Sequence, residues 1–445
     1  MALAVGLVLA DGSVVVLALP DIYRDLNTSV SGATWVLVSF NLVLALAAVP
    51  AALASRRAGP GRAAAVGLAV FAGASLACGI ASDLESLILA RCVQAVGGAF
   101  AVTAALELLP SVVGSERRAA VSWAAAGAAG AAFGPGVGGA LTELVSWESI
   151  FLLQVPLALL AALPLLGIAR TESEAGTIER EVRRAGAPHL PASLALGLIQ
   201  AAIAAALFLV VLLLIEGWRM SPIAAAVVVT GMPLAALAGG SLARLVSSPR
   251  ARAGAGAVLV AGGLAALGLM PKALVVLTLP PQILVGVGLS LVLSALTETA
   301  LAGRSPQAIH GGWTIASRHA GVVLGLLALT PVFTADLREQ RRNAVDAGTA
   351  VVLDARVEPL VKIDLAGRIS DRLDEERGKV PVIGPAFEPL PEDPDERADV
   401  VALREQLQDQ LDRAATHAFS ASFLIAAGLA LLALVPISAG RRVDL

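Results

Sequence analysis

The feature that most constrains this chain is a series of long apolar segments, each bounded by charged or turn-forming residues. A helix needs about 20 apolar residues to cross a bilayer, and about twelve segments reach that length. They are 2–20, 33–54, 62–81, 85–109, 118–143, 147–169, 189–216, 221–246, 253–271, 274–300, 309–335 and 415–438. Their apolar residues do not alternate with polar ones as in barrel strands, so we expect helices. The sequence therefore predicts an all-α integral membrane protein in a lipid bilayer.

Composition agrees with a chain that is largely covered by lipid. Hydrophobic residues make up 57% and charged residues only 15%, whereas soluble domains carry about 25% charged residues. The segment 336–414 alone holds more than half of the acidic residues. Elsewhere charge is confined to short clusters. Because no extended basic region is present there, we expect no nucleic acid partner.

Nothing in the sequence predicts an enzyme, a metal site or a cofactor. Cys78 and Cys92 both fall inside apolar segments, where a thiol is usually a packing residue. The histidines show no ligand spacing, and no glycine-rich phosphate loop follows a strand. The histidines are His189, His310, His319 and His417.

Basic residues predict the orientation in the membrane. Among the short connections, one alternating set carries nearly all of them, whereas the opposite set carries only Arg24, Arg219 and Lys272. Because cytoplasmic loops are enriched in Lys and Arg, we expect both termini in the cytoplasm and 336–414 outside. The N-terminus is apolar from Ala2 and is interpreted as the first span. Arginine far outnumbers lysine, which is associated with a bacterial source. We therefore expect the protein in a plasma membrane, specifically a bacterial inner membrane.

A charged connection divides the spans into two groups of six. The predicted domains are an N-terminal half (1–169), a cytoplasmic linker (170–188), a C-terminal half (189–335 with 415–440) and an extracytoplasmic insertion (336–414). Two six-helix halves are typical of transporters built from repeats. The layout therefore favours transport over a helical bundle with another purpose.

The insertion is predicted to be largely helical. Val400, Leu403, Leu407 and Leu411 keep helical spacing and lead without a breaker into the last span, while 336–354 continues the span before it. A proline-rich stretch joins them, with Pro381, Pro385, Pro389, Pro391 and Pro394. Two interpretations are open. The insertion is either a solvated cap, or it contacts a partner protein or shields a substrate path.

Four runs of residues carry a resemblance to a known family. Asp11–Ile22 is similar to the signature Asp-Thr-Ile-Val-Asn-Val-Ala-Leu-Pro-x-Ile, and Arg91–Gly97 to Arg-x-x-Gln-Gly-x-Gly. Gly134–Gly139 resembles the antiporter signature, and Trp147–Pro156 a Trp-Arg-Trp-x-Phe-x-x-Asn-x-Pro run. These runs resemble the drug:proton antiporter branch of the major facilitator superfamily, whose members mostly have fourteen spans. The match is thinner in the second half.

The chain departs from that family in the loop between the second and third segments. The family reads Gly-x-x-x-Asp-Arg-x-Gly-Arg-Arg there, and the resemblance implies a gating role for Arg56, Arg57, Gly59 and Arg62. Arg56 occupies the acidic position, which puts the usual gating contact in question. Two central spans of the family are absent, leaving about twelve.

Asp11 is the only carboxylate well inside any segment. A charge at the centre of a helix costs roughly 2.5–3.5 kcal/mol on insertion scales, so such a residue usually faces a partner or a wet cavity. Arg91 lies within about 5 Å of the same depth, and the family places both spans at the cavity. Asp11 is either a proton-coupling residue paired with Arg91, or half of a permanent ion pair that fixes helix packing.

Other polar residues in the segments are candidates for a substrate cavity. Arg318, near the midplane, is expected to bind an anionic group of a substrate or to pair with an acid. Gln94, Gln200 and Asn41 either line the cavity or pack between helices. Four acids near segment ends are expected to be solvated, namely Glu107, Glu143, Glu216 and Glu298.

Glycines recur along the fifth segment. Gly130, Gly134 and Gly138 form one smooth face that a neighbouring helix can approach closely. Pro135 favours a bend, and Gly139 lies beside it. We interpret this region as a helix pivot, a role that close packing also explains.

The resemblance implies a secondary active transporter that exports a small hydrophobic or amphipathic compound in exchange for protons. Two alternatives are open. One is an exporter of lipids or glycolipids that works with an extracytoplasmic partner. The other is a non-transporting scaffold or sensor, which the altered loop at Arg56 suggests.

Overall fold

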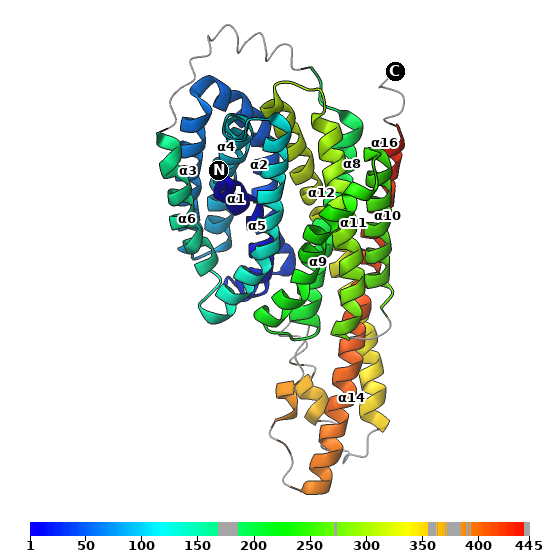
Figure 1. Cartoon of the computed structure of the whole chain (residues 1–445). Helices are drawn as coiled ribbons and strands as arrows, with labels where there is room; N and C mark the ends of the chain where they lie inside the picture. Colours follow the sequence, from blue (N-terminus) through cyan, green and yellow to red (C-terminus); the bar gives the residue numbers. More distant parts are fainter. Residues whose placement is uncertain are drawn as a thin grey trace.

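The structure is a computed structural model that describes residues 1–167, 186–270, 274–354, 362, 364–369, 371, 384–388, 390 and 393–439. In this part of the chain the regular secondary structure is entirely helical (Figure 1). The predicted linker 170–188 lies almost wholly outside the described residues, as do Pro381, Pro389 and Pro391.

The first group of helices begins and ends at residues that suit helix termini. Its members are α1 (Ala2–Asp25), α2 (Val30–Ala58), α3 (Pro60–Gly79), α4 (Leu84–Val113), α5 (Glu116–Leu144) and α6 (Ser149–Leu166). Ser29, Asp83 and Ser115 each accept a hydrogen bond from a backbone N–H of the following first turn, which is the usual N-cap arrangement. Donation by the backbone N–H of Ser86 lowers the pKa of the Asp83 carboxyl.

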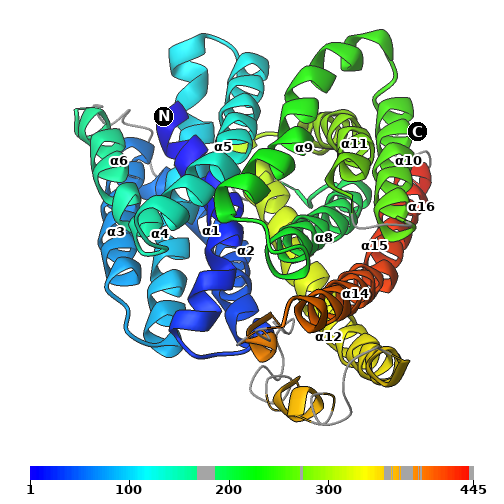
Figure 2. The same cartoon turned by 90° about the horizontal axis from the view of Figure 1, so that it is seen from below.

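The second group follows the linker. It contains α8 (Leu190–Leu212) with the π-helical turn η1 (Leu213–Gly217), α9 (Pro222–Leu242) with the 3-10 turn η2 (Ala243–Leu245), α10 (Pro249–Gly268), α11 (Val275–Leu301), α12 (Gln307–Asp354), α14 (Pro394–Ala418), α15 (Ser420–Leu432) and α16 (Leu434–Ala439). Seen from below, the two groups lie side by side (Figure 2). The domain boundaries given above remain predictions.

Ten described helices are long and apolar enough to cross a membrane. The remaining two spans of the expected set are α6, which is a shorter apolar helix, and the Ala- and Gly-rich α5, which packs against α1 inside the same bundle (Figure 1). Large apolar side chains such as Leu46, Phe133 and Leu324 are exposed on the bundle, as expected for surfaces in contact with lipid. The multi-pass membrane architecture of about twelve helices is therefore confirmed.

The helical insertion between the last two spans is also confirmed. α12 continues far below the bundle, and α14 returns beside it (Figure 1). Val400, Leu403 and Leu407 share a buried face of α14 and pack with Leu365 and Phe387 in a small apolar core. The predicted apolar stripe thus covers a core of the insertion itself.

The expectation of an unbroken helix into the last span was wrong. α14 ends at Ala418 and α15 begins at Ser420. The ring of Phe419 at this junction packs 4.5 Å from that of Phe333 in α12, and the Ser420 hydroxyl donates to the carbonyl oxygen of Gly268. These tertiary contacts compensate for the backbone hydrogen bonds that are lost where the helix is interrupted.

Candidate functional site

The first group of helices holds a buried ion pair between Asp11 of α1 and Arg91 of α4. Nη2 of Arg91 lies 2.6 Å from Oδ2 of Asp11, and Nη1 donates a hydrogen bond to Oδ1 at 2.8 Å. Both side chains are 0% exposed. Two parallel contacts between a guanidinium and a carboxylate are stronger and more directional than neutral hydrogen bonds. The pairing expected from their similar depths is present.

Three further polar side chains complete a network around the pair. Gln94 accepts a hydrogen bond from Arg91 Nη1 at 2.6 Å, and Gln154 of α6 donates to Asp11 Oδ1 at 3.1 Å. The amide nitrogen of Gln94 donates to Gln154 and to Ser75 of α3, both at 2.7 Å. The network joins α1, α3, α4 and α6, so a change of charge at Asp11 affects hydrogen bonds on four helices.

Arg91 has partners besides the carboxylate. Its Nε donates to the carbonyl oxygen of Val36 at 3.2 Å, and its guanidinium carbon lies 4.2 Å from the ring centre of Phe40 and 5.6 Å from that of Phe151. Aromatic faces attract cations. The guanidinium therefore keeps favourable contacts when the charge of Asp11 is removed.

The structure does not place this pair at an opening between the two helix groups, which is where the resemblance puts it. Residues three and four apart lie on one side of a helix, so Asp11 shares a face of α1 with Val8 and Val15. Both valines are buried among apolar side chains. Its partners all belong to α1–α6. Gln94, expected at the cavity, belongs to the same network.

Asn41 makes a contact between the two groups. Its amide nitrogen donates to the carbonyl oxygen of Leu37 at 2.8 Å, so its oxygen is left to accept from Nδ1 of His319 in α12, at 2.6 Å. This assigns Nδ1 of His319 as the donor. The only sequence signal for His319 was that its imidazole side chain is polar and lies within an apolar segment.

Arg318 and Gln200 are both half-buried, on α12 and α8. Nε of Arg318 is buried and has no hydrogen-bond partner. Gln200 precedes Ala201, which packs closely against Gly325 of α12. Both residues therefore lie near the contact of α8 with α12.

The altered loop makes an ion pair within the first group. Arg56 Nε lies 3.5 Å from Oε1 of Glu107 in α4, while Arg57 and Arg62 are exposed. Gly59 joins α2 to α3 with φ 91°, a conformation that favours glycine. Glu107 is half-buried and paired, so the expectation that it is solvated was wrong.

The glycines of α5 face two different neighbours. Gly130, Gly134 and Gly138 face α1, where a Cβ on Gly138 would lie 2.5 Å from a carbonyl oxygen. Gly139 faces α9 of the other group, where its Cβ would lie 2.6 Å from a carbonyl oxygen. Pro135, which follows Gly134, has no backbone N–H and cannot donate a hydrogen bond within the helix. α5 thus contacts both groups through surfaces without side chains.

An ion pair joins the two groups at the end from which the insertion projects, here called the insertion end. Arg24 at the end of α1 forms an ion pair with Glu216 of η1, and the indole of Trp218 donates to Thr416 in α14 at 3.1 Å. Glu216 is 7% exposed, so the expectation of a solvated residue was wrong. Residues at helix ends carry few clues to such partners, and no spacing in the sequence links Arg24 to Glu216.

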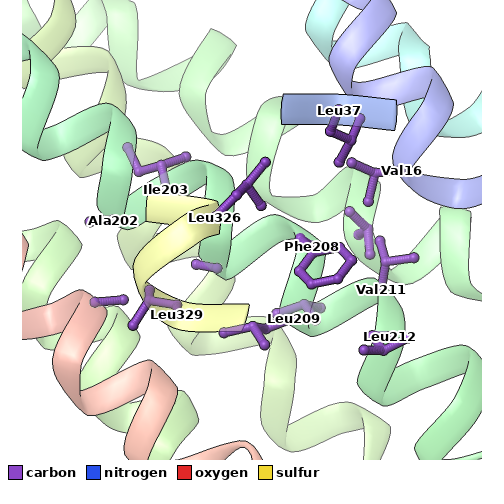
Figure 3. Packing of buried hydrophobic residues seen from close by; sticks show 14 of the residues in the cluster. Val16, Leu37, Ala202, Ile203, Phe208, Leu209, Val211, Leu212, Leu326 and Leu329 are labelled. Atoms are coloured by element: carbon purple, nitrogen blue, oxygen red, sulfur yellow. The ribbon is translucent and has the colours of Figure 1, made fainter. Parts of the chain in front are cut away.

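Apolar side chains from both groups also meet deeper in the bundle, about two helical turns from this ion pair along α1. Val16 and Leu37 of the first group belong to one cluster with Phe208, Val211 and Leu326 of the second (Figure 3). Continuous apolar contact excludes water and holds the groups together on this side.

The opposite end contains a small hollow between the groups, with room for about one water molecule. It lies between α4, α5, α11 and α12 and is lined by Leu106, Trp123, Thr297, Leu301, Gly311 and Thr314. No feature of the sequence predicted this hollow.

Comparison with known proteins adds three kinds of similarity. A family model described as Major Facilitator Superfamily matches residues 1–333. The methylenomycin A resistance protein of Bacillus subtilis is 36% identical over 160 residues, which cover 35% of this chain and 34% of that protein. The drug efflux pump JefA of Mycobacterium tuberculosis is 32% identical over 174 residues, covering 38% and 34%. The chain thus matches these curated relatives over about a third of their length.

Solved structures share the fold over about three quarters of the chain or more. An inward-facing, occupied bacterial homologue of the human lysosomal transporter Spinster has a TM-score of 0.63 at 17% identity, covering 97% of this chain and 95% of that one. A D-xylose–proton symporter has a TM-score of 0.57 at 12% identity, covering 73% and 87%.

Proposed function

We propose, from the premise that the chain belongs to the Major Facilitator Superfamily, that it is a proton-coupled antiporter exporting a hydrophobic or amphipathic compound by alternating access. The named relatives are efflux and resistance proteins, which favours export over lipid transport with an outer partner or a scaffold role. The family also favours a transporter over an enzyme.

The observation that carries the proposal is the buried Asp11–Arg91 pair. A carboxylate with no exposed surface is stable only while its charge is compensated. Asp11 has one cationic partner and one amide donor, on α4 and α6. Its protonation state is therefore tied to the positions of these helices, which is the property that coupling requires.

Proton binding changes the network in a definite way. A protonated Asp11 no longer attracts Arg91 electrostatically, and the guanidinium keeps the Val36 carbonyl and the Phe40 ring. Because Asp11 is 0% exposed here, proton exchange needs a conformation in which α1 moves relative to α4 or α6. Uptake and release then occur only at defined stages of the cycle.

The α5 glycine surfaces and the α2–α3 loop are the proposed moving parts. α5 packs on α1 through Gly130, Gly134 and Gly138 and on α9 through Gly139, so a bend at Pro135 displaces both groups. We assign the gating role of the loop to the Arg56–Glu107 ion pair, which has the acid on α4 instead of the loop. A smooth helix surface allows such movement with few side-chain rearrangements.

We further propose that both termini are cytoplasmic, because the basic connections lie on their side. The insertion end then faces outward, in a bacterial plasma membrane. The N-terminal half, linker, C-terminal half and insertion have the boundaries predicted above.

The test uses the full chain in proteoliposomes with an imposed pH gradient and two probes, methylenomycin A and ethidium. Accumulation of either probe that collapses with a protonophore is expected for the wild type and is lost in Asp11→Asn. Asp83→Asn is the matched control, because Asp83 is an exposed cap outside the network and Asn caps helices equally well. Gradient-independent movement of both probes, or full accumulation by Asp11→Asn, contradicts the proposal.

A further inference from the structure

At the insertion end, a side chain of the first group bonds to the backbone of the second. α5 and α9 lie side by side (Figures 1 and 2). Oε2 of Glu143 in α5 accepts a hydrogen bond from the backbone N–H of Ile223 in α9, at 2.8 Å. A Cβ on Gly139, one turn before Glu143, would lie only 2.6 Å from the carbonyl oxygen of Pro222. The lack of a side chain at position 139 therefore lets α5 approach the start of α9 closely enough for this bond.

The first turn of α9 does not find all of its hydrogen-bond partners in its own sequence. The first N–H groups of a helix have no carbonyl partner within that helix. Pro222 carries no N–H, and the N–H of Ala224 donates to the hydroxyl of Ser221 at 3.3 Å. The N–H of Ile223 is the donor that remains, and Glu143 accepts from it. Glu143 thus completes the cap of a helix that belongs to the other group.

The charge of Glu143 is favourable toward α9 and unfavourable within its own helix. Glu143 lies in the last turn of α5, where the helix carries a partial negative charge that disfavours an acid. The start of α9 carries the opposite partial charge. A local preference that is violated and then compensated elsewhere is typical of functional positions. The place of this acid therefore points to a role in the contact between the groups.

The bond can be broken at little cost when the insertion end opens. Glu143 is exposed, as its place near a segment end predicted, so water can replace the N–H of Ile223 as its partner once α5 and α9 separate. The hydroxyl of Ser221 stays with α9, and the helix keeps part of its cap in both states. Glu143 therefore stabilises a closed insertion end without making the closure permanent.

We propose that Glu143 is a positioning residue of the transport cycle: by capping α9 from the first group, it favours the state in which the insertion end is closed. This inference rests on the proposed alternating access and assigns one of the contacts that set the balance between its states. A contact made in one state only shifts the balance toward that state. Loss of Glu143 should therefore favour the open insertion end about two- to fivefold, as expected for an exposed charge at a helix terminus.

The test measures how often the insertion end opens in the full chain in nanodiscs. The reporter is Val211→Cys, which lies in the apolar contact between the groups, in a background with Cys78 and Cys92 replaced by alanine. Its rate of labelling by a maleimide follows the open fraction when opening and closing are faster than labelling. Glu143→Ala should speed this labelling about two- to fivefold. Glu143→Gln keeps an oxygen acceptor without the charge, so its rate should lie between those of the reporter chain and Glu143→Ala.

Two controls separate the cap from less specific effects. Glu148→Ala should leave the labelling rate unchanged, because Glu148 lies at the same end, before α6, and its side chain caps no backbone N–H. A second reporter, Leu106→Cys, lies where α4 contacts Gly311 of α12 at the opposite end. General loosening of the bundle would speed labelling of both reporters, whereas a shift toward the open insertion end should not speed labelling of Leu106→Cys.

The donor can be removed separately by Ile223→Pro, since proline has no N–H and is tolerated in the first turn of a helix. Ile223→Pro should itself speed labelling of Val211→Cys, and Glu143→Ala should then add nothing. Three outcomes overturn the inference: unchanged labelling in Glu143→Ala, an equal increase in Glu148→Ala or at Leu106→Cys, or a full effect of Glu143→Ala in the Ile223→Pro background.

Labelling and transport together separate this inference from the proposed function. Faster labelling of the reporter in Glu143→Ala, in a chain whose probe transport does not depend on a pH gradient, supports the cap and contradicts the antiport proposal. Gradient-driven transport together with unchanged labelling in Glu143→Ala has the reverse meaning.

Discussion

At the scale of single residues, two buried carboxylates are each compensated by an arginine. Asp11 and Arg91 have no exposed surface, and each compensates the other at 2.6 Å. Arg24 and Glu216 form a second pair, between the two helix groups. Removing one member of a buried pair leaves an uncompensated charge, which is more costly than removing both.

Arg91→Ala should therefore destabilise the protein by roughly 3–5 kcal/mol, because it leaves Asp11 buried without its cation. Asp11→Asn should cost less, since Gln154 and Arg91 can still contact the amide. Thermal unfolding of the purified variants measures both effects. Adding Asp11→Asn to Arg91→Ala should recover part of the lost stability, and an additive loss would show that the two residues are not energetically coupled.

The sequence predicted the pair but not the whole network. Asp11 and Arg91 stand out because charges are rare inside spans and these two have similar depths. Gln154 and Ser75 do not stand out, since single amides and hydroxyls occur in helix interiors without marking a direction. The partners of His319 and Glu216 were not predicted for a related reason: they are about 200 or more residues distant, and only tertiary packing brings them together.

At the scale of helices, close packing depends on where glycine is placed, not on how much of it there is. A Cβ on Gly138 would lie 2.5 Å from a carbonyl oxygen of α1, whereas nothing lies within 4 Å of a Cβ on Gly136. The sequence periodicity predicted the face of Gly130, Gly134 and Gly138. It could not show that Gly139 contacts α9, because the neighbour of a helix face is a property of the assembled bundle.

Gly138→Ala and Gly136→Ala should have opposite effects on the thermal stability of the protein. Both gain helix propensity, by about 1 kcal/mol. At position 138 this gain is opposed by overpacking against α1, which costs roughly 1–3 kcal/mol. The Tm of purified Gly138→Ala should therefore fall below that of Gly136→Ala, and transport should slow only in Gly138→Ala. Equal behaviour of the two variants would show that α1 and α5 do not pack as closely as described.

Helix boundaries illustrate a second limit of the sequence. The spans were predicted within a few residues, because their length is set by the bilayer. The break at Phe419 was not, since no proline or glycine marks it. Contacts of Phe419 with Phe333 and of Ser420 with Gly268 explain it.

At the scale of the whole molecule, the two groups of helices meet differently at the two ends. The insertion end is held by the Arg24–Glu216 pair and the apolar cluster of Figure 3. The other end contains the small hollow. Alternating access requires the insertion end to open, and these contacts must then separate.

Glu216→Ala should make the insertion end open more often, because Arg24 then loses its partner in the second group. We expect faster labelling of Val211→Cys by a membrane-impermeant maleimide, in a background with Cys78 and Cys92 replaced by alanine. Glu85→Ala is the matched control, since Glu85 is an exposed acid at the start of α4. Unchanged labelling in Glu216→Ala would show that this pair does not hold the end closed.

The central claim is that Asp11 couples protons to transport and is not needed for the movement of the carrier itself. The most direct measurement compares Asp11→Asn with the wild type in two assays on the same proteoliposomes: exchange of a transported probe without a pH gradient, and accumulation of that probe with one. Asp11→Asn should keep exchange and lose gradient-driven accumulation. Accumulation at the wild-type level, or loss of exchange in a variant that is still folded, would contradict it.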